Sequence, residues 1–246
     1  MRKFILGFLM ANCIGASMQI SNAADWAVGT DKENKPFNFV EGGKRVGFDQ
    51  DILAEVAKDL GKSYKVTAMD FSALVPGLQT GSLDAALASI YVTEARKQVI
   101  DFSEPYYQSA LGIMVRKDDN SIQAIQDLKG KVVASVTGGG GAKWLKANMP
   151  DNEARLFPSV TELFLELESG RAQAIVFDYP TLAYYAQSGG AAKVKMVPQM
   201  VGEPIPVAIA FPKGSALVPQ VNAVLEKMRA DGRYDAIYRK WFNRAP

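Results

Sequence analysis

The chain has 246 residues, of which 48% are hydrophobic and 22% are charged, and its formal net charge is +2 at pH 7. This ordinary globular composition excludes a disordered chain, and the mean hydropathy of -0.03 excludes an integral membrane protein. The sequence has no histidine and a single cysteine. Ser-His-Asp and Cys-His catalysis are therefore excluded, and no zinc or copper site is expected.

The N-terminal residues are typical of a secretory signal peptide. Arg2 and Lys3 form a short positive region, and residues 4–18 are mostly apolar but too short for a membrane span. Residues 21–23 supply small side chains at the positions that a signal peptidase recognises. We predict cleavage after Ala23, and hence a secreted, periplasmic protein. A retained N-terminal anchor and a lipoprotein are the alternatives.

Cleavage would change both the charge and the redox chemistry of the chain. It removes the only cysteine, Cys13, so the mature protein has no disulfide and depends on its core for stability. It also removes Arg2 and Lys3, which leaves 26 acidic and 26 basic side chains. A formally neutral protein is a poor partner for nucleic acid, so we expect no such partner.

Strands and helices alternate in the first part of the chain. Apolar residues recur at helical spacing from Ile52 to Leu60 and are followed by Gly61, which predicts a helix over residues 48–60. The remaining patterns predict strands at residues 26–30, 64–69 and 83–90 and a short helix at 71–79.

The pattern restarts in the second half. We expect strands at residues 131–136, 174–177 and 207–211, and helices after the glycine run 138–141, at 160–168, at 182–187, over 218–228 and after Gly232 through Trp241. This alternation predicts parallel sheets with helices on their faces. Residues 78–85 and 167–174 share the order of helix end, glycine and strand entry, which favours two similar lobes.

Several short segments carry a resemblance to a known family. They are Val-Gly-Phe-Asp at residues 46–49, Met-Asp-Phe at 69–71, Thr-Glu-Ala-Arg-Lys at 93–97, Ile-Asp-Phe-Ser at 100–103, Pro-Tyr-Tyr at 105–107, Asp-Leu-Lys-Gly-Lys-Val at 127–132, Ala-Phe-Pro-Lys-Gly at 210–214 and Tyr-Arg-Lys-Trp-Phe at 238–242. In this order and spacing, the chain resembles the periplasmic amino-acid-binding proteins of ABC importers (solute-binding protein family 3), most closely the glutamine-binding branch. The resemblance covers essentially the whole mature chain.

The resemblance implies an α/β fold of two lobes, the type II periplasmic-binding-protein fold, with two hinge strands. Lobe 1 would comprise residues 24–106 and 207–246, and lobe 2 residues 107–206 with the hinge crossings. These crossings are expected near residues 106–110 and 203–207. Proteins of this kind close about their hinge around a ligand.

Arg96 is the candidate that binds the α-carboxylate of the ligand. A guanidinium offers two parallel N–H donors to a carboxylate, and Arg96 follows a buried predicted strand, where open α/β sheets place ligands. The glycine run supplies further donors, with Thr137, Gly139 and Gly140 in the pocket, because glycines that open a helix expose their N–H groups. The alternatives are a surface arginine and a flexible or phosphate-binding loop.

Asp178 is the candidate partner for the α-ammonium, because it ends a buried predicted strand and the family places an aspartate there. Its alternative role is a helix cap before Pro180. By resemblance, Ser89 adds its backbone carbonyl to the same ammonium, and Phe71 and Phe177 form apolar walls around the ligand.

The positions that recognise the ligand side chain depart in part from the glutamine-binding branch. Asp31 matches the family's aspartate at this place. The family's lysine corresponds to Val136, its histidine to Phe177, its threonine to Tyr91, and the aromatic residue that covers the ligand to Asn34, for which Phe37 is close enough to substitute.

Charge counting then favours a cationic ligand. Asp31 and Asp178 oppose Arg96 alone, so the predicted pocket has a net charge of minus one, whereas a glutamine pocket sums to zero. Lysine, arginine, ornithine or histidine would cancel that charge, and the family branch that binds them shows the same count. Alternatively, Asp31 is satisfied by Lys32, Lys35 or backbone donors, and glutamine is the ligand.

We therefore predict an extracytoplasmic solute-binding protein that captures a free polar amino acid and delivers it to the membrane permease of an ABC importer. It is expected to be a monomer and not an enzyme, with no catalytic residue, metal or cofactor. Two alternatives are a periplasmic enzyme of the same fold, such as a cyclohexadienyl dehydratase or a cell-wall lytic enzyme, and a sensor that reports amino acids to a receptor.

Overall fold

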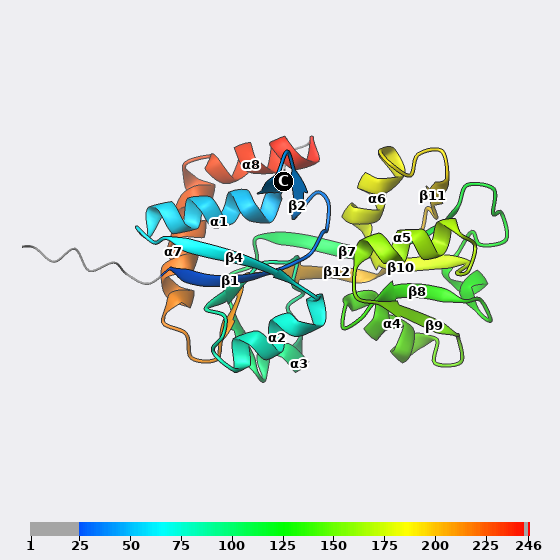
Figure 1. Ribbon diagram of the computed structural model, residues 1–246, viewed down its shortest axis with the longest axis horizontal. Coiled ribbons are helices and arrows are strands. Elements are labelled where there is room, and N and C mark those ends of the chain that lie inside the picture. The colour runs from blue at the N-terminus through cyan, green and yellow to red at the C-terminus, as the bar shows by residue number, and fades with distance from the viewer. Residues whose placement is uncertain (1–24, 244–245) are drawn as a thin grey trace, which may run out of the picture.

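The computed structural model describes residues 25–243 and 246. The predicted signal peptide and its cleavage site lie outside the described residues. Two separate sheets form the centres of two lobes, which lie side by side along the long axis of the molecule (Figure 1). Within the described residues, no helix combines the length and the apolar character that crossing a membrane requires.

Lobe 1 is the part built on a five-stranded sheet in the order β4-β1-β5-β13-β6. Its strands are β1 (Trp26–Asp31), β4 (Tyr64–Met69), β5 (Ala85–Ala86), β6 (Ile100–Phe102) and β13 (Ala210–Pro212). Strand β1 is parallel to β4 and β5, whereas β13 is antiparallel to β5 and β6. Its helices are α1 (Phe48–Asp59), α2 (Phe71–Gln79), α3 (Glu94–Lys97), α7 (Leu217–Ala230) and α8 (Arg233–Phe242). A hairpin of β2 (Phe39–Glu41) and β3 (Lys44–Val46) completes the lobe.

Lobe 2 is built on the sheet β11-β7-β10-β8-β9, in which β12 also pairs with β7. Its strands are β7 (Tyr107–Arg116), β8 (Val133–Val136), β9 (Ala154–Phe157), β10 (Ala174–Asp178), β11 (Val194–Met196) and β12 (Val201–Val207). Strand β8 is parallel to β9 and β10, whereas β7 is antiparallel to its neighbours. Helix α4 (Gly140–Asn148) covers one face, and α5 (Val160–Glu168) and α6 (Tyr179–Gln187) cover the other (Figure 1). A short 3-10 helix spans Ile125–Leu128.

Helix α1 shows how local sequence sets these elements. Gly47 precedes it with φ of 136°, and a Cβ there would lie 2.0 Å from the Phe37 carbonyl oxygen, so only glycine fits. Asp49 and Asp51 lie in the first turn, where the helix dipole favours acidic side chains. The apolar side chains at helical spacing are buried against the sheet and α8, as the periodicity of the sequence predicts.

Two strands run between the lobes side by side. Strands β7 and β12 are antiparallel, with Tyr107 opposite Val207 and Ser109 opposite Ile205 (Figure 1). The pairing extends into lobe 1, because the Tyr106 N–H donates to the Val207 carbonyl at 2.9 Å. These strands occupy the positions at which the hinge crossings were expected. The division of the chain at residues 106 and 207 remains a prediction.

An aromatic cluster lies where β7 leaves lobe 1. Phe48 and Tyr107 each contact the Phe242 ring, with centroids 5.0 Å apart in both pairs, and Phe37 contacts Tyr107 at 5.2 Å. Phe37 is fully buried in this cluster. The expectation that Phe37 covers a ligand in place of an aromatic residue at position 34 is therefore wrong, because its ring belongs to the core of lobe 1.

Two expected strands differ from the structure. Residues 83–90 are nearly all buried, as predicted, but only Ala85–Ala86 form a strand, since the backbone turns to a positive φ of 50° at Ser89. Residues 207–211 are not one strand, because β12 ends at Val207 in the sheet of lobe 2 and β13 begins at Ala210 in the sheet of lobe 1. Both errors fall at the boundary between the lobes.

Candidate ligand-binding site

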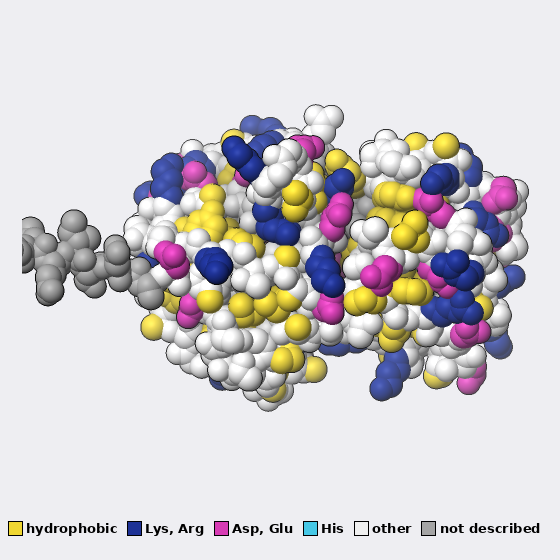
Figure 2. Space-filling model, in the orientation of Figure 1, with side chains coloured by type: hydrophobic (Ala, Val, Ile, Leu, Met, Phe, Trp, Pro, Cys, Tyr) yellow, Lys and Arg dark blue, Asp and Glu magenta, His cyan; other side chains and the backbone are white. Residues whose placement is uncertain are grey.

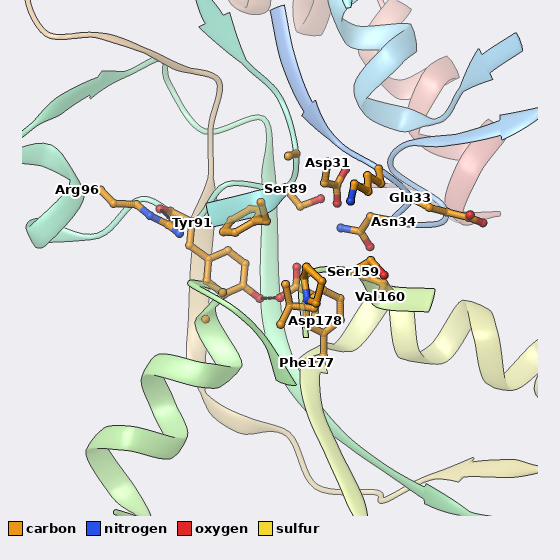
Figure 3. A pocket seen from close by; sticks show the side chains of 17 residues that line it. Asp31, Glu33, Asn34, Ser89, Tyr91, Arg96, Ser159, Val160, Phe177 and Asp178 are labelled. Carbon is orange, nitrogen blue, oxygen red and sulfur yellow. Dashed lines mark hydrogen bonds between the residues drawn. The ribbon is translucent and has the colours of Figure 1, made fainter. Parts of the chain in front are cut away.

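A pocket lies between the two lobes, at the carboxyl ends of their parallel strands (Figure 3). About 470 Å³ of space, open solvent included, lies within its lining. The lining residues are Asp31, Lys32, Glu33, Asn34, Phe71, Ala88, Ser89, Tyr91, Arg96, Val136, Gly139, Gly140, Pro158, Ser159, Val160, Phe177 and Asp178. Because parallel strands end at the same edge of a sheet, residues that are far apart in the chain meet here.

The structure brings nearly all of the predicted site residues together. Thr137 is the exception, since it does not line the pocket and its N–H donates to the Phe157 carbonyl at 2.9 Å. The molecule narrows between the lobes, and side chains of both charge signs lie along this waist on the face shown in Figure 2. Pairs of this kind include Lys32 with Asp70 at 2.7 Å and Lys35 with Glu33 at 3.5 Å.

Arg96 is buried in the wall of the pocket and does not lie on the surface. Thr93 caps α3 by accepting a hydrogen bond from the Arg96 N–H at 3.3 Å, and this turn directs the arginine side chain inward. One guanidinium nitrogen donates to the Tyr91 carbonyl at 2.9 Å and another to the Gly138 carbonyl of lobe 2 at 3.2 Å. The guanidinium also lies 5.3 Å from the centre of the Phe71 ring. Arg96 therefore already contacts both lobes, and it has five N–H donors in all.

The glycine run opens α4, as predicted, and two of its glycines are required by close packing. A Cβ on Gly140 would lie 2.6 Å from the Tyr91 ring, and one on Gly141 would lie 2.1 Å from the Val176 carbonyl oxygen. Gly138 adopts a φ of 76°, which favours glycine as well. The first N–H groups of a helix have no acceptor within the helix, so α4 presents donors toward the pocket beside Gly139 and Gly140.

Asp178 lies at the end of β10 and is almost fully buried. It precedes α6 but makes no side-chain capping bond, and its Oδ1 instead accepts a hydrogen bond from the Tyr91 hydroxyl at 2.7 Å (Figure 3). The same hydroxyl is hydrogen-bonded to Ser109 of β7 at 3.2 Å. Burial, with a smaller effect of the nearby Asp31, raises the pKa of Asp178 to about 7 against the lowering effects of Tyr91 and Arg96. The carboxylate is thus poised to gain from a cationic partner.

Asp31 ends β1 and is held by an amide that is itself fixed. Asn38 donates to the Asp31 Oδ1 at 2.8 Å and to the Asp31 carbonyl at 2.7 Å. The Asn38 Oδ1 in turn accepts from Arg45 at 2.8 Å and from Gln50 at 3.2 Å. Burial raises the pKa of Asp31 to about 6, against the lowering effects of Asn38 and Arg45. Neither Lys32 nor Lys35 pairs with Asp31, so its partner on the protein is an amide rather than a lysine.

Apolar and uncharged groups form the rest of the wall. Phe71, Phe177 and Val136 line the pocket, and Val136 is only 4% exposed where the family resemblance places a lysine. Asn34 accepts a hydrogen bond from the Thr181 hydroxyl at 2.5 Å. Because Asn34 belongs to lobe 1 and Thr181 to α6 of lobe 2, this bond joins the lobes at the edge of the pocket.

Sequence reasoning missed the contribution of the loop between β9 and α5. Pro158, Ser159 and Val160 line the pocket, and Ser159 caps α5 by accepting from the Glu162 N–H at 3.3 Å. The Ser-x-x-Glu pattern at residues 159–162 marks a helix start in the sequence. Recognising β9 as a strand parallel to β8 would have placed this helix start at the edge of the pocket.

Residues 27–244 match the model of the bacterial extracellular solute-binding proteins, family 3. The chain belongs to this family. The ABC transporter glutamine-binding protein GlnH of Bacillus subtilis (strain 168) is 35% identical over 212 residues, which are 83% of this chain and 75% of that protein.

Two solved structures show the same fold. An ancestral arginine-binding protein bound to arginine is 38% identical with a TM-score of 0.85, covering 89% of this chain and 98% of that one. The ancestral amino acid-binding protein AncCDT-1, a precursor of cyclohexadienyl dehydratase, is 36% identical with a TM-score of 0.81, covering 89% and 95%. The predicted family and the two-lobed type II fold are thereby confirmed.

The pocket of this solute-binding protein offers donors and acceptors at separate places. Arg96 and the start of α4 supply N–H donors on one side, and Asp178 and Asp31 supply carboxylate oxygens on the other (Figure 3). Among the residues that the structure describes, no cluster of His, Cys, Asp or Glu is arranged to hold a metal ion. The arrangement suits a small molecule that carries a carboxylate and more than one cationic group.

Proposed function

We propose that this solute-binding protein captures a free amino acid with a cationic side chain in the periplasm and delivers it, as a monomer, to the membrane permease of an ABC importer. Buried charge carries the proposal. Asp31, Asp178 and Arg96 are 7%, 6% and 7% exposed, so two anions and one cation share one buried pocket. Uncompensated buried charge is unfavourable, and a ligand with a net charge of plus one removes it.

Each part of such a ligand has a complementary group in the pocket. The α-carboxylate would bind Arg96 and the Gly140 N–H, since the Gly139 N–H already donates to the Val136 carbonyl at 3.0 Å. The α-ammonium would bind Asp178 and the carbonyl of Ser89, and the side-chain cation would bind Asp31. The ion pairs beside the pocket do not change its net charge, since each pair is neutral. Lys32, for example, pairs with Asp70 within lobe 1.

Glutamine is the second candidate ligand, and one observation favours it. Arg45 lies at the far end of Asn38 and lowers the pKa of Asp31, so part of the Asp31 charge is offset by the protein. The similarity to the glutamine-binding GlnH supports the same alternative. The arginine-binding neighbour supports the cationic class.

We propose no enzymatic turnover, although AncCDT-1 is a precursor of an enzyme. Of the three carboxylates that line the pocket, Asp31 and Asp178 have binding roles in the scheme above, and Glu33 pairs with Lys35 at 3.5 Å. Incubation with a prephenate-like acid, followed by product analysis, tests this directly, and any turnover would overturn it.

Substitutions at Asp31 and Val136 test the proposed ligand class. Asp31→Asn keeps the bond from Asn38 but removes the charge, so arginine and lysine should weaken at least tenfold more than glutamine, about 1.4 kcal/mol. Val136→Lys restores a zero count and should shift the preference about tenfold toward glutamine. Calorimetry of arginine, lysine and glutamine against the three proteins measures both effects. A wild-type preference for glutamine, or equal weakening of all ligands by Asp31→Asn, would show that charge does not govern selection.

The affinity should also depend on pH. The pKa of Asp178 is raised to about 7, so below that pH the unliganded carboxyl holds a proton that must leave before an ammonium binds. Arginine binding should therefore be constant above about pH 8 and weaken on acidification, approaching tenfold per pH unit below the pKa. Arginine itself keeps nearly all of its charge from pH 5.5 to about 8, so calorimetry across this range isolates the protein. A flat profile would mean that no pocket carboxyl titrates on binding.

A further inference from the structure

Asp49 is a fully buried carboxylate that does not line the pocket. It lies in the first turn of α1, and each of its oxygens accepts one hydrogen bond. The Tyr106 hydroxyl donates to Oδ1 at 2.7 Å, and the backbone N–H of Ser89 donates to Oδ2 at 3.1 Å. Burial raises the pKa of the Asp49 carboxyl, and these two hydrogen bonds act to lower it. The charge balance that we derived for the pocket makes no use of this residue.

Ser89 needs such a partner because its backbone conformation is unfavourable. Its φ is 50°, and in the described residues the other non-glycine residue with positive φ is Asn243, which ends α8. A side chain in this region costs about 1 kcal/mol, so the surroundings must hold it there. The chain on either side of Ser89 follows the sheet, since the Leu87 N–H donates to the Gly29 carbonyl at 3.0 Å and the Ala208 N–H donates to the Ile90 carbonyl at 3.2 Å.

The positive φ therefore occurs at one residue, Ser89, at the point where the chain lines the pocket. Ser89 is 3% exposed and lines the pocket, and its N–H leaves the sheet to reach Asp49. The φ and ψ angles of Ser89 set the direction of its carbonyl relative to its N–H. A group that fixes the N–H, together with the bonds that hold Leu87 and Ile90, thus restricts where the carbonyl points.

We propose that Asp49 is a positioning residue of the ammonium subsite, which holds Ser89 in its left-handed conformation and so directs the Ser89 carbonyl toward the α-ammonium of the ligand. An aspartate is suited to this place because both of its oxygens accept from donors. Asparagine could keep both bonds, because its Oδ1 would accept from the Ser89 N–H and its NH2 would donate to the Tyr106 hydroxyl, whereas leucine has a similar shape and accepts neither. The inference rests on the proposed amino-acid ligand but not on the charge of its side chain.

The test compares a ligand that has an α-amino group with one that lacks it. Binding of arginine and of 5-guanidinopentanoate, its des-amino analogue, is measured by calorimetry for the wild type and for Asp49→Leu, which removes the acceptor of the Ser89 N–H. We expect Asp49→Leu to weaken arginine about tenfold and the analogue less than about twofold, because the Ser89 carbonyl serves only the ammonium. Equal weakening of both, or no weakening of arginine, would overturn the proposal. The same comparison is made with glutamine and its des-amino analogue, glutaramate. If the protein prefers glutamine to arginine, this second pair tests the role of Asp49 separately from the proposed ligand class.

Two further variants separate positioning from general stability. Tyr106→Phe removes the other donor to Asp49 but leaves the Ser89 bond, so it should keep the discrimination between the two ligands. Ser89→Gly adopts a positive φ without strain, so adding Asp49→Leu to it should change the discrimination less than about threefold relative to Ser89→Gly alone. This double variant also replaces Asp49→Leu if the single variant does not fold. Loss of discrimination in Tyr106→Phe, or an undiminished effect in the glycine background, would show that Asp49 does not act through the conformation of Ser89.

Discussion

Arg96→Ala is expected to abolish amino-acid binding. The substitution removes the proposed fork of charge-assisted hydrogen bonds to the carboxylate, each worth about 1.5–3 kcal/mol. It also removes the bond from Arg96 to the Tyr91 carbonyl within lobe 1 and the bond to the Gly138 carbonyl, which joins lobe 1 to lobe 2. Two such bonds together correspond to roughly a hundredfold to ten-thousandfold loss of affinity, which calorimetry measures directly.

Two further variants show whether the loss of binding comes from the guanidinium of Arg96 or only from the loss of a positive charge. Arg96→Lys should fail nearly as badly, because an ammonium cannot offer two parallel donors from one rigid plane. Lys97→Ala removes a positive charge from the same short helix, where Lys97 is exposed and pairs with Glu94 at 2.8 Å, and should bind normally. Retained affinity in Arg96→Ala would exclude Arg96 from the binding site.

Asp178→Asn should weaken binding about a hundredfold, equivalent to about 2.7 kcal/mol. Asparagine keeps the size of the side chain and still accepts a hydrogen bond from Tyr91, so the change removes the charge that faces the ammonium. The pH dependence between pH 8 and 6 should shrink in the same variant, leaving the part due to Asp31. Calorimetry at both pH values measures the two effects together.

The alternative role of Asp178 has a different signature. If the side chain served as a helix cap, the variant would bind normally but unfold at a lower temperature. The structure does not support the role of a helix cap, because Asp178 makes no side-chain hydrogen bond to the first turn of α6. A thermal unfolding curve recorded beside the calorimetry distinguishes the two roles.

The sequence predicts best where periodicity and local stop signals agree. The helix predicted over residues 71–79 matches α2 in full, and residues 160–168 match α5, since apolar spacing and a following glycine mark both. Arg96 and Asp178 could be placed in the pocket because each follows a segment predicted to be a buried strand, whereas Asp31 was assigned by the family resemblance. The position of Asp31 and Asp178 at strand ends is a property of the fold class rather than of their side chains.

What the sequence could not predict depends on contacts between distant residues. The hydrogen bond from Tyr91 to Asp178 spans 87 positions, and that from Thr181 to Asn34 spans 147. No local pattern encodes either bond. The prediction of a strand over residues 83–90 was wrong for a related reason. Hydrophobicity indicates burial but not the positive φ at Ser89, whose N–H donates to Asp49.

The interleaved sheet of lobe 1 has a consequence for the order of folding. Strand β13 lies between β5 and β6, so this sheet is incomplete until residues 210–212 have been synthesised. The strands of lobe 2 lie within one continuous stretch, residues 107–207, and can pair earlier. Since chains emerge from the ribosome N-terminus first, β5 and β6 wait for a shared partner, β13, that is synthesised after the strands of lobe 2. The sheet of lobe 1 thus stays incomplete until late in synthesis, and an incompletely folded chain is one that can still be threaded across a membrane.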